Sequence, residues 1–355
     1  MARALRLAER GLYTTTPNPR VGCVIVRDGR VLGEGWHRKA GEPHAEIAAL
    51  RAAGKAGTDV RGSTVYVSLE PCSHHGRTPP CANALIDAGV ARVVAAMRDP
   101  NPQVAGRGIE LLTLAGIQAQ VGLLEAQAQE LNLGFVSRMT RGRPWLRLKT
   151  AASLDGKTAL LNGESKWITG AAARADVHRW RARACAILTG VGTVKADDPR
   201  MNVRGMQTDR QPLKVILDSR LATPPGARIL DGGALIACAA ADPERRATLE
   251  AAGAEVLSLP GADGRVDLAG MLAELARRGV NELHAEAGAT LNGALLAGGL
   301  VDEWLAYFAP LVMGHEARGL FSLPALADMA GRRGFAVHHL ARVGDDLRLL
   351  LRPVP

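Results

Sequence analysis

Apolar and polar positions alternate along the first part of the chain in a way that predicts strands and helices in turn. Two apolar runs, residues 21–26 and 31–36, flank an Asp28-Gly29 turn and predict a β-hairpin. The strand-helix-strand order expected within residues 64–97 is typical of a parallel βαβ unit. The remaining elements of this part are predicted as a helix at 2–10, a helix at 44–53 that stops at Gly54, a strand at 64–69, a helix at 80–88, a strand at 90–97, a helix around Ile109, a strand at 117–121 and a long helix through Arg138.

A basic stretch rich in helix breakers, residues 141–144, predicts a linker after this first part. From Val301 onward, strand-like pieces separated by Gly and Pro indicate antiparallel strands at one edge of a sheet. Before them, strands that alternate with helices are expected at 145–152, 186–191, 213–217, 234–239, 255–259 and 282–286. The 355 residues are therefore predicted to form two α/β domains, residues 1–143 and 144–355.

The composition is that of an ordinary globular protein, with 47% hydrophobic and 22% charged residues. Aromatic residues make up only 3%, so few rings are available for stacking on bases, and extended single-strand binding is disfavoured. The net charge of +9 is spread along the chain and forms no basic tail. This charge favours an anionic partner such as a phosphorylated small molecule, although a solvated basic surface explains it equally well.

Cysteine usage and the N-terminus together predict a soluble cytoplasmic protein. The five cysteines are odd in number and irregularly spaced, so no disulfide framework is visible. Arg3 and Arg6 interrupt the apolar positions at the start of the chain, which excludes a signal-peptide core there. No run approaches the roughly 18 apolar residues of a membrane-spanning helix.

The strongest chemical signal is a set of metal-ligand residues at the ends of predicted elements. His44 stands at the start of a helix, Cys72 follows a strand and Cys81 stands at the start of the next helix. One imidazole and two thiolates supply three of the four ligands of a tetrahedral zinc site, and the fourth position can hold a water molecule. Glu46 is placed to act as the base for that water. This H-x-E, P-C and Cys pattern matches the zinc nucleobase deaminases.

Two other readings of these residues stay open. His74 or His75 could complete a closed structural zinc site, and a chance arrangement of a buried cysteine pair is also conceivable. The polar and basic insertion 73–80 is expected to wall the pocket and to meet a polar or anionic substrate. Asn18 and His37 are polar residues at loop edges near this site, but each also fits an ordinary turn or surface position.

Glycine-rich turns in the second part are compatible with phosphate binding. Residues 287–294 follow the predicted strand 282–286 and open a helix, where backbone N–H groups can approach a phosphate. The spacing matches neither the Rossmann nor the P-loop fingerprint, and close helix packing also explains such glycines. Residues 189–199 form a second strand end of this kind, in which Asp197 or Asp198 could be only a turn former.

Taken together, these segments resemble the bifunctional riboflavin-biosynthesis family, in which a diaminohydroxyphosphoribosylaminopyrimidine deaminase is fused to a 5-amino-6-(5-phosphoribosylamino)uracil reductase. The long insertion between the cysteines is particularly specific to this family. The resemblance runs almost from end to end and rests on T-x-P-N-P-x-V-G at 15–22, G-E-P-H-A-E at 41–46, E-P-C-S-H-H-G-R-T-P-P-C at 70–81, D-P-N-P-x-V-A-G-x-G at 99–108, K-x-A-x-S-L-D-G at 149–156, G-E-S-x-W-I-T at 163–169 and E-A-G-x-T-L-x-G at 286–293.

The resemblance implies a cytidine-deaminase-like three-layer α/β/α domain that binds zinc, followed by a dihydrofolate-reductase-like α/β domain that uses NADPH. It also implies a phosphorylated pyrimidine substrate, no nucleic-acid or membrane partner, and a homo-oligomer, either a dimer or a tetramer. Zinc would be bound by His44, Cys72 and Cys81. The implied deaminase substrate contacts are Asn18, His37, His74, Arg77 and Thr78.

In the reductase half, the resemblance implies cofactor contacts at Ala151, Trp167, Thr193, Asp197, Ser219, Gly288, Ala289, Thr290, Leu291, Asn292, Gly293 and Ala294. The implied substrate contacts are Ser165, Arg181, Met201, Arg204 and Glu286, with the arginines meeting the ribose phosphate.

The expected chemistry is hydrolytic deamination followed by reduction. Glu46 would pass a proton from the activated water to the ring nitrogen and then to the departing ammonia. NADPH would deliver a hydride to the ribose C1′, with Lys149 and Glu286 as candidates for polarising or protonating the opening sugar. The rivals are a deaminase of a nucleoside or tRNA with a degenerate second domain, and a zinc-stabilised binding module that has a protein ligand at the fourth position.

Overall fold

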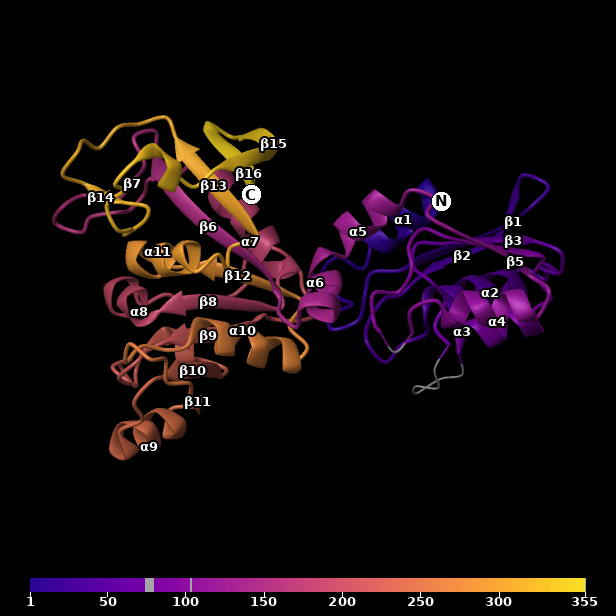
Figure 1. Cartoon of the computed structure of the whole chain (residues 1–355), viewed down its shortest axis with the longest axis horizontal. Coiled ribbons are helices and arrows are strands. Elements are labelled where there is room, and N and C mark those ends of the chain that lie inside the picture. The colour runs from indigo at the N-terminus through magenta and orange to yellow at the C-terminus, as the bar shows by residue number, and fades with distance from the viewer. Residues whose placement is uncertain (74–79, 103, 355) are drawn as a thin grey trace. The chain divides into compact units, whose positions relative to one another are not determined.

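The computed structural model describes residues 1–73, 80–102 and 104–354 of the chain. The chain divides into two compact units, Met1–Arg143 and Pro144–Pro355 (Figure 1). Among the described residues, no helix has the length and apolar character needed to cross a membrane.

The first unit is built on a five-stranded sheet. Its elements are α1 (Ala2–Glu9), β1 (Gly22–Arg27), β2 (Arg30–Trp36), α2 (Ala45–Lys55), β3 (Thr64–Val67), α3 (Cys81–Asp87), β4 (Arg92–Ala95), α4 (Arg107–Leu114), β5 (Gln118–Val121), α5 (Glu125–Leu131) and α6 (Leu133–Arg141). The strand order is β2-β1-β3-β4-β5. Strand β1 is antiparallel to β2 and β3, whereas β3, β4 and β5 are parallel, so the predicted hairpin and βαβ unit are both confirmed.

Alternation along β1 places helices on both faces of this sheet. A Cβ on Gly22 would lie 2.0 Å from the Ala4 carbonyl oxygen, so α1 packs directly on that side of the strand. The next residue, Cys23, points to the opposite face and belongs to the apolar core that includes Ala45 and Ala49 of α2. The first unit therefore has the helix-sheet-helix layering seen in Figure 1.

The second unit is built on a nine-stranded sheet. Its elements are β6 (Trp145–Ser153), β7 (Lys157–Ala159), α7 (Ala171–Arg183), β8 (Ala186–Gly190), α8 (Val191–Asp197), β9 (Leu213–Leu217), the 3-10 turn η1 (Arg228–Leu230), β10 (Ala234–Cys238), α9 (Pro243–Ala251), β11 (Ala254–Ser258), α10 (Leu268–Arg277), β12 (Glu282–Glu286), α11 (Ala289–Ala297), β13 (Glu303–Ala309), β14 (Arg318–Gly319), the 3-10 turn η2 (Met329–Gly331), β15 (Phe335–Val343) and β16 (Asp346–Pro353).

The strand order of this sheet is β11-β10-β9-β8-β12-β6-β13-β16-β15. Neighbouring strands from β11 to β13 are parallel, whereas β16 is antiparallel to both of its neighbours, β13 and the edge strand β15. One apolar core joins the sheet to α10 and α11, and a second joins its other face to α8 and α9. The carboxyl ends of β6, β8 and β12 consequently meet at one edge, which is where ligands bind in open parallel sheets.

The structure departs from the predicted elements in two informative places. The long helix expected through Arg138 is two helices, α5 and α6, that break at Asn132. The buried Asn132 side chain accepts from the Arg20 N–H at 2.8 Å and donates to the Arg20 carbonyl at 3.0 Å, so it pairs with a distant backbone. The glycine-containing segment after β8 was expected to be a turn, but it forms helix α8.

Candidate functional site

The three predicted metal ligands come together in the first unit. His44 is the N-cap of α2 and Cys81 is the first residue of α3, whereas Cys72 lies in the segment between β3 and α3. The His44 Nδ1 atom lies 3.6 Å from the Cys72 sulfur and 3.3 Å from the Cys81 sulfur. All three candidate ligand atoms lie within 4.8 Å of one another. One imidazole nitrogen and two sulfurs at this spacing fit the donor set that zinc prefers.

The protonation states of the two cysteines support the same conclusion. A hydrogen bond with the Cys81 thiol, together with His44 and the Cys81 backbone N–H at 3.3 Å, lowers the pKa of Cys72 to about 4. The neighbouring Cys72 sulfur and burial both raise the pKa of Cys81. A divalent cation bound between the sulfurs would remove the repulsion that keeps the second thiol protonated.

Glu46 lies on the first turn of α2, close to these ligands, and is only 3% exposed. Burial and the negative charge of Cys72 raise the pKa of Glu46 to about 7. A carboxyl group with a pKa near neutrality can both accept and release a proton at physiological pH. The position and the environment of Glu46 therefore suit a proton-transfer role beside the metal centre.

Asn18 and His37 are linked to each other and to the metal centre. The Asn18 Nδ2 group lies 3.0 Å from His37 Nε2, and His37 Nδ1 lies 3.1 Å from the Pro43 carbonyl oxygen. This pattern places the ring proton of His37 on Nδ1, which donates to Pro43, while Nε2 accepts from the Asn18 amide. The His37 ring also meets His44 edge-on, with 5.4 Å between centroids.

His37 was predicted to contact substrate, yet it is only 3% exposed and both of its ring nitrogens have partners within the protein. Its observed contacts hold Pro43 next to the candidate ligand His44. His74, Arg77 and Thr78, the other predicted contacts, and His75, one candidate for a fourth metal ligand, lie outside the described residues.

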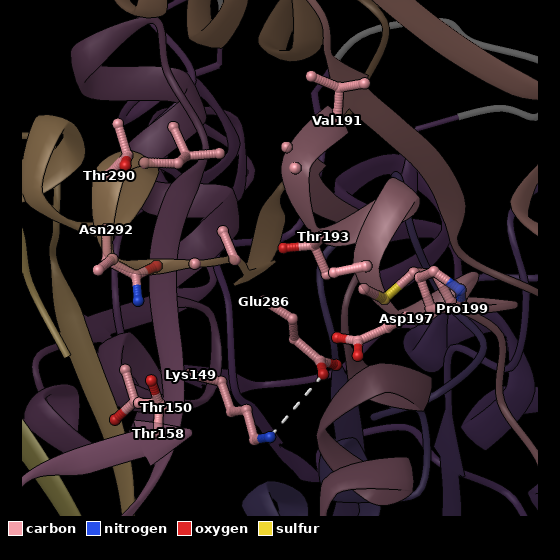
Figure 2. A pocket seen from close by; sticks show the side chains of 18 of the residues that line it. Lys149, Thr150, Thr158, Val191, Thr193, Asp197, Pro199, Glu286, Thr290 and Asn292 are labelled. Carbon is pink, nitrogen blue, oxygen red and sulfur yellow. Dashed lines mark ion pairs between the residues drawn. The ribbon is translucent and has the colours of Figure 1, made fainter. Parts of the chain in front are cut away.

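The second unit contains a cavity of about 1790 Å³ at the carboxyl ends of its parallel strands. Figure 2 shows Lys149 and Thr150 from β6, Glu286 from β12, Thr193 and Asp197 from α8, and Asn292 from α11 around this space. The predicted residues that line it are Lys149, Ala151, Ser165, Trp167, Arg181, Thr193, Asp197, Met201, Arg204, Ser219, Glu286, Gly288, Ala289, Thr290, Leu291, Asn292 and Ala294.

Gly293 is the one predicted cofactor residue that does not line the cavity. A Cβ at this position would lie 2.0 Å from the Ser322 carbonyl oxygen, so this glycine permits α11 to pack closely against that backbone.

Glu286 is the centre of a charged cluster in the cavity. Arg181 binds its carboxylate with two nitrogens, at 2.5 and 3.0 Å, and Lys149 Nζ lies 3.9 Å away, as the dashed line in Figure 2 indicates. Burial opposes ionisation of Glu286, but the charges of Arg181 and Lys149 outweigh it and hold its pKa well below the usual value. Burial lowers the pKa of Lys149 despite the nearby carboxylate. Glu286 therefore stays ionised, and the lowered pKa of Lys149 makes its ammonium group a stronger acid than that of an exposed lysine.

Basic side chains gather at another part of the cavity wall. Burial and the charges of Arg181, Arg200 and Arg228 lower the pKa of Arg204. Arg228 is paired with Asp198 at 2.9 Å, which leaves an excess of positive charge in this group. A bound phosphate would relieve the repulsion among these guanidinium groups.

His178 also lines the cavity, although the sequence analysis did not identify it. Its Nδ1 atom accepts a hydrogen bond from the Arg204 backbone N–H at 3.1 Å. It precedes Arg181 by three residues on α7, and residues three apart share one face of a helix. The three-residue spacing from Arg181 on a predicted helix was the sequence signal that could have identified His178.

Comparisons with known proteins bear on both units. Residues 1–97 match the family model of the cytidine and deoxycytidylate deaminase zinc-binding region, and residues 144–346 match that of the RibD C-terminal domain. The riboflavin biosynthesis protein RibD of Escherichia coli strain K12 is 48% identical, over 99% of this chain and 98% of that protein. The chain belongs to the RibD family.

Solved RibD structures agree with this assignment. The Acinetobacter baumannii RibD structure in form 2 has a TM-score of 0.91 and 44% identity, covering 99% of this chain and 97% of that one. The diaminohydroxyphosphoribosylaminopyrimidine deaminase/5-amino-6-(5-phosphoribosylamino)uracil reductase of Thermotoga maritima has a TM-score of 0.88 and 34% identity, covering 100% and 97%.

Membership of the RibD family confirms the predicted fold class, a cytidine-deaminase-like α/β unit and a RibD-type reductase α/β unit. The protein is a bifunctional deaminase and reductase of riboflavin biosynthesis that acts on small molecules and uses zinc and NADPH. A purely structural zinc module and a single-function deaminase are thereby excluded.

Proposed function

We propose that the Met1–Arg143 unit deaminates 2,5-diamino-6-ribosylamino-4(3H)-pyrimidinone 5′-phosphate and that the Pro144–Pro355 unit then reduces the ribosyl group to ribityl. The product would be 5-amino-6-ribitylaminouracil 5′-phosphate. The observation that carries the proposal is that each unit contains its own acid-base residue. In the first unit this residue lies beside the candidate metal ligands, and in the second it lies in the cavity. Glu46 lies beside three metal-ligand atoms, and Lys149 lies beside a buried carboxylate and a basic wall.

In the deamination, His44, Cys72 and Cys81 would hold zinc. When bound, zinc lowers the pKa of a coordinated water and so makes a nucleophile available near neutral pH. Glu46 would take one proton of the attacking water and deliver it to the ring nitrogen of the pyrimidine. It would then take the proton of the newly added hydroxyl group and pass it to the amino group, which leaves as ammonia as the carbonyl forms. Its pKa of about 7 suits both directions of this transfer.

Asn18 and His37 have different duties in this scheme. The Asn18 amide nitrogen is engaged by His37, so its carbonyl oxygen is the atom offered to a substrate amino group. His37 orients Asn18 on one side and holds Pro43 on the other. His74, Arg77 and Thr78 are further proposed contacts, on the motif alone.

In the reduction, NADPH supplies the hydride when bound. As hydride adds to C1′, the bond from C1′ to the ring oxygen breaks and that oxygen needs a proton. Lys149 is the proposed donor because burial lowers its pKa, and Glu286 stays ionised to hold Lys149 and Arg181 in place. Arg204 and its basic neighbours are the proposed site of the substrate phosphate.

The remaining cavity residues are assigned by motif and position. The proposed NADPH contacts are Ala151, Trp167, Thr193, Asp197, Ser219, Gly288, Ala289, Thr290, Leu291, Asn292 and Ala294. The proposed substrate contacts beside Arg181, Arg204 and Glu286 are Ser165 and Met201. We also propose a cytoplasmic protein with no nucleic-acid partner, on the basis of cysteine usage and the small number of aromatic residues. A homo-oligomer, either a dimer or a tetramer, is proposed from the family resemblance alone.

The two-site assignment is tested by Glu46→Gln in the full chain. We expect ammonia release to fall by about 10²-fold or more, because a general acid-base group contributes that much. NADPH oxidation with pre-deaminated substrate should be unchanged, and Glu9→Gln, an exposed carboxyl on α1, should leave both activities intact. Joint loss of both activities in a folded Glu46→Gln protein would contradict the assignment.

A further inference from the structure

Glu70 is a buried carboxylate that stands two residues before the proposed zinc ligand Cys72. Glu70 is only 3% exposed, and its backbone N–H donates to the Met97 carbonyl at 2.9 Å. Among the described residues, no lysine, arginine or histidine forms an ion pair with it. A buried carboxylate needs other compensation for its charge.

Four backbone N–H groups supply that compensation. Asp99 and Gly106 donate to Oε2 at 3.1 and 3.0 Å, and Gly108 and Ile109 donate to Oε1 at 2.9 and 3.3 Å. The last two belong to the first turn of α4, whose N–H groups have no partner within the helix and carry partial positive charge. One carboxylate therefore binds both Asp99 and the start of α4.

The start of α4 packs against the peptide that precedes Cys72. A Cβ on Gly108 would lie 2.0 Å from the Pro71 carbonyl oxygen and 3.2 Å from Glu70 Oε1. The absence of a side chain at Gly108 is what allows α4 to approach Pro71 this closely. Glu70 thus draws a helix start directly onto the backbone that carries Cys72.

Cys72 depends on such support because it lies outside every helix and strand. Its sulfur nevertheless has to meet two partners, the His44 imidazole at 3.6 Å and the Cys81 backbone N–H at 3.3 Å. His44 and Cys81 stand at helix ends and are placed by those helices. Cys72 is therefore positioned by tertiary contacts and not by a helix or strand of its own.

We propose that Glu70 is a positioning residue of the metal centre: its carboxylate binds the start of α4, the start of α4 packs on Pro71, and Pro71 places the Cys72 sulfur for zinc. The proposal rests on the proposed zinc site, but Glu70 itself touches neither the metal nor the substrate. Groups that orient metal ligands typically change metal affinity by about 10- to 100-fold when they are lost.

The first test is Glu70→Gln in the full chain, which keeps the shape but replaces an acceptor oxygen by an N–H₂ donor facing backbone N–H groups. We expect zinc affinity, measured by competition with a chromophoric chelator, to fall about 10- to 100-fold. After replacement of zinc by cobalt(II), the thiolate-to-cobalt absorption should weaken or shift. The matched control is Glu110→Gln, an exposed carboxyl on the first turn of the same helix, which should change neither measurement.

A second variant reaches the same ligand by another route. Gly108→Ala keeps Glu70 but forces a Cβ against the Pro71 carbonyl, so it should reproduce the loss of zinc affinity and the altered cobalt spectrum. Gly54→Ala, on α2 with no atom within 4 Å of the added Cβ, is its control. NADPH oxidation with pre-deaminated substrate reports on the rest of the chain in every variant.

The outcomes separate this proposal from the proposed function. Unchanged zinc affinity and an unchanged cobalt spectrum in both variants would overturn the role of Glu70 and leave the Glu46→Gln result untouched. Loss of NADPH oxidation in parallel with zinc affinity would also overturn it, because Glu70 would then support the fold as a whole. If Glu70→Gln fails to fold, the Gly108→Ala measurements decide.

Discussion

In the first unit, the candidate ligand atoms of His44, Cys72 and Cys81 lie within 4.8 Å of one another, and Glu46 follows on the first turn of α2. The cavity of the second unit instead takes its polar groups from residues spread over 149–319. The first site concentrates its chemistry in a few side chains at helix ends. The second site distributes its polar groups over strand ends, a glycine-containing helix start and several arginines. We therefore expect all-or-none responses to substitution in the first site and graded responses in the second.

The largest effect is expected from Cys81→Ser, which removes one of the two sulfurs that lie close to the His44 imidazole. Zinc content should fall to a small fraction of one equivalent per chain by elemental analysis, and ammonia release should be lost with it. NADPH oxidation with pre-deaminated substrate should persist. Cys238→Ala, at a buried cysteine of the second unit, is the control, and a zinc-replete Cys81→Ser protein would refute the concentrated site.

An intermediate effect is expected from Arg181→Met in the reductase cavity. Arg181 helps hold the pKa of Glu286 down, so its removal should raise that pKa. Because Glu286 acts as an anion, the acid limb of the pH profile for NADPH oxidation should move to higher pH, with activity lost earlier as the pH falls. Deamination should be unaffected. An acid limb that stays in place or moves to lower pH would show that Arg181 does not control Glu286.

The smallest effect is expected from Gly293→Ala, where the added Cβ meets the Ser322 carbonyl oxygen. Overpacking of this kind typically lowers the free energy of unfolding by about 1–3 kcal/mol. Thermal unfolding should register that loss, while the KM for NADPH changes little because Gly293 does not line the cavity. Gly226→Ala, with nothing within 4 Å of its Cβ and outside the cavity lining, is the matched control. A large rise in KM without loss of stability would return Gly293 to the cofactor site.

The difference between the sites also explains how far each could be predicted from sequence. His44, Cys72, Cys81 and Glu46 follow a short pattern whose spacing already implies the donor set, and the structure brings them together. The strands that carry Lys149 and Glu286 were predicted from the alternation of strands and helices in the second part of the chain, although both mix apolar with charged residues.

What could not be predicted depends on partners far away in the sequence. Nothing local to Asn132 says that its side chain pairs with the Arg20 backbone and interrupts a helix. His37 reads as a loop residue until Pro43 and Asn18 are seen on its two nitrogens. Gly293 belongs to a phosphate-type turn by motif, and only the packing of Ser322 reveals its steric role.

The pairing of Asn132 with Arg20 has a further consequence for the deaminase half. Arg20 belongs to the same short segment as Asn18, so the joint between α5 and α6 anchors the loop that supplies Asn18 beside His37. If residues are inserted or deleted in the stretch leading to Asn132, that stretch must bulge or contract to keep the Asn132 amide in place. Otherwise the loop that carries Asn18 shifts with the amide. The tolerance of α5 and α6 to changes in length is thereby coupled to the placement of Asn18, the proposed pyrimidine contact.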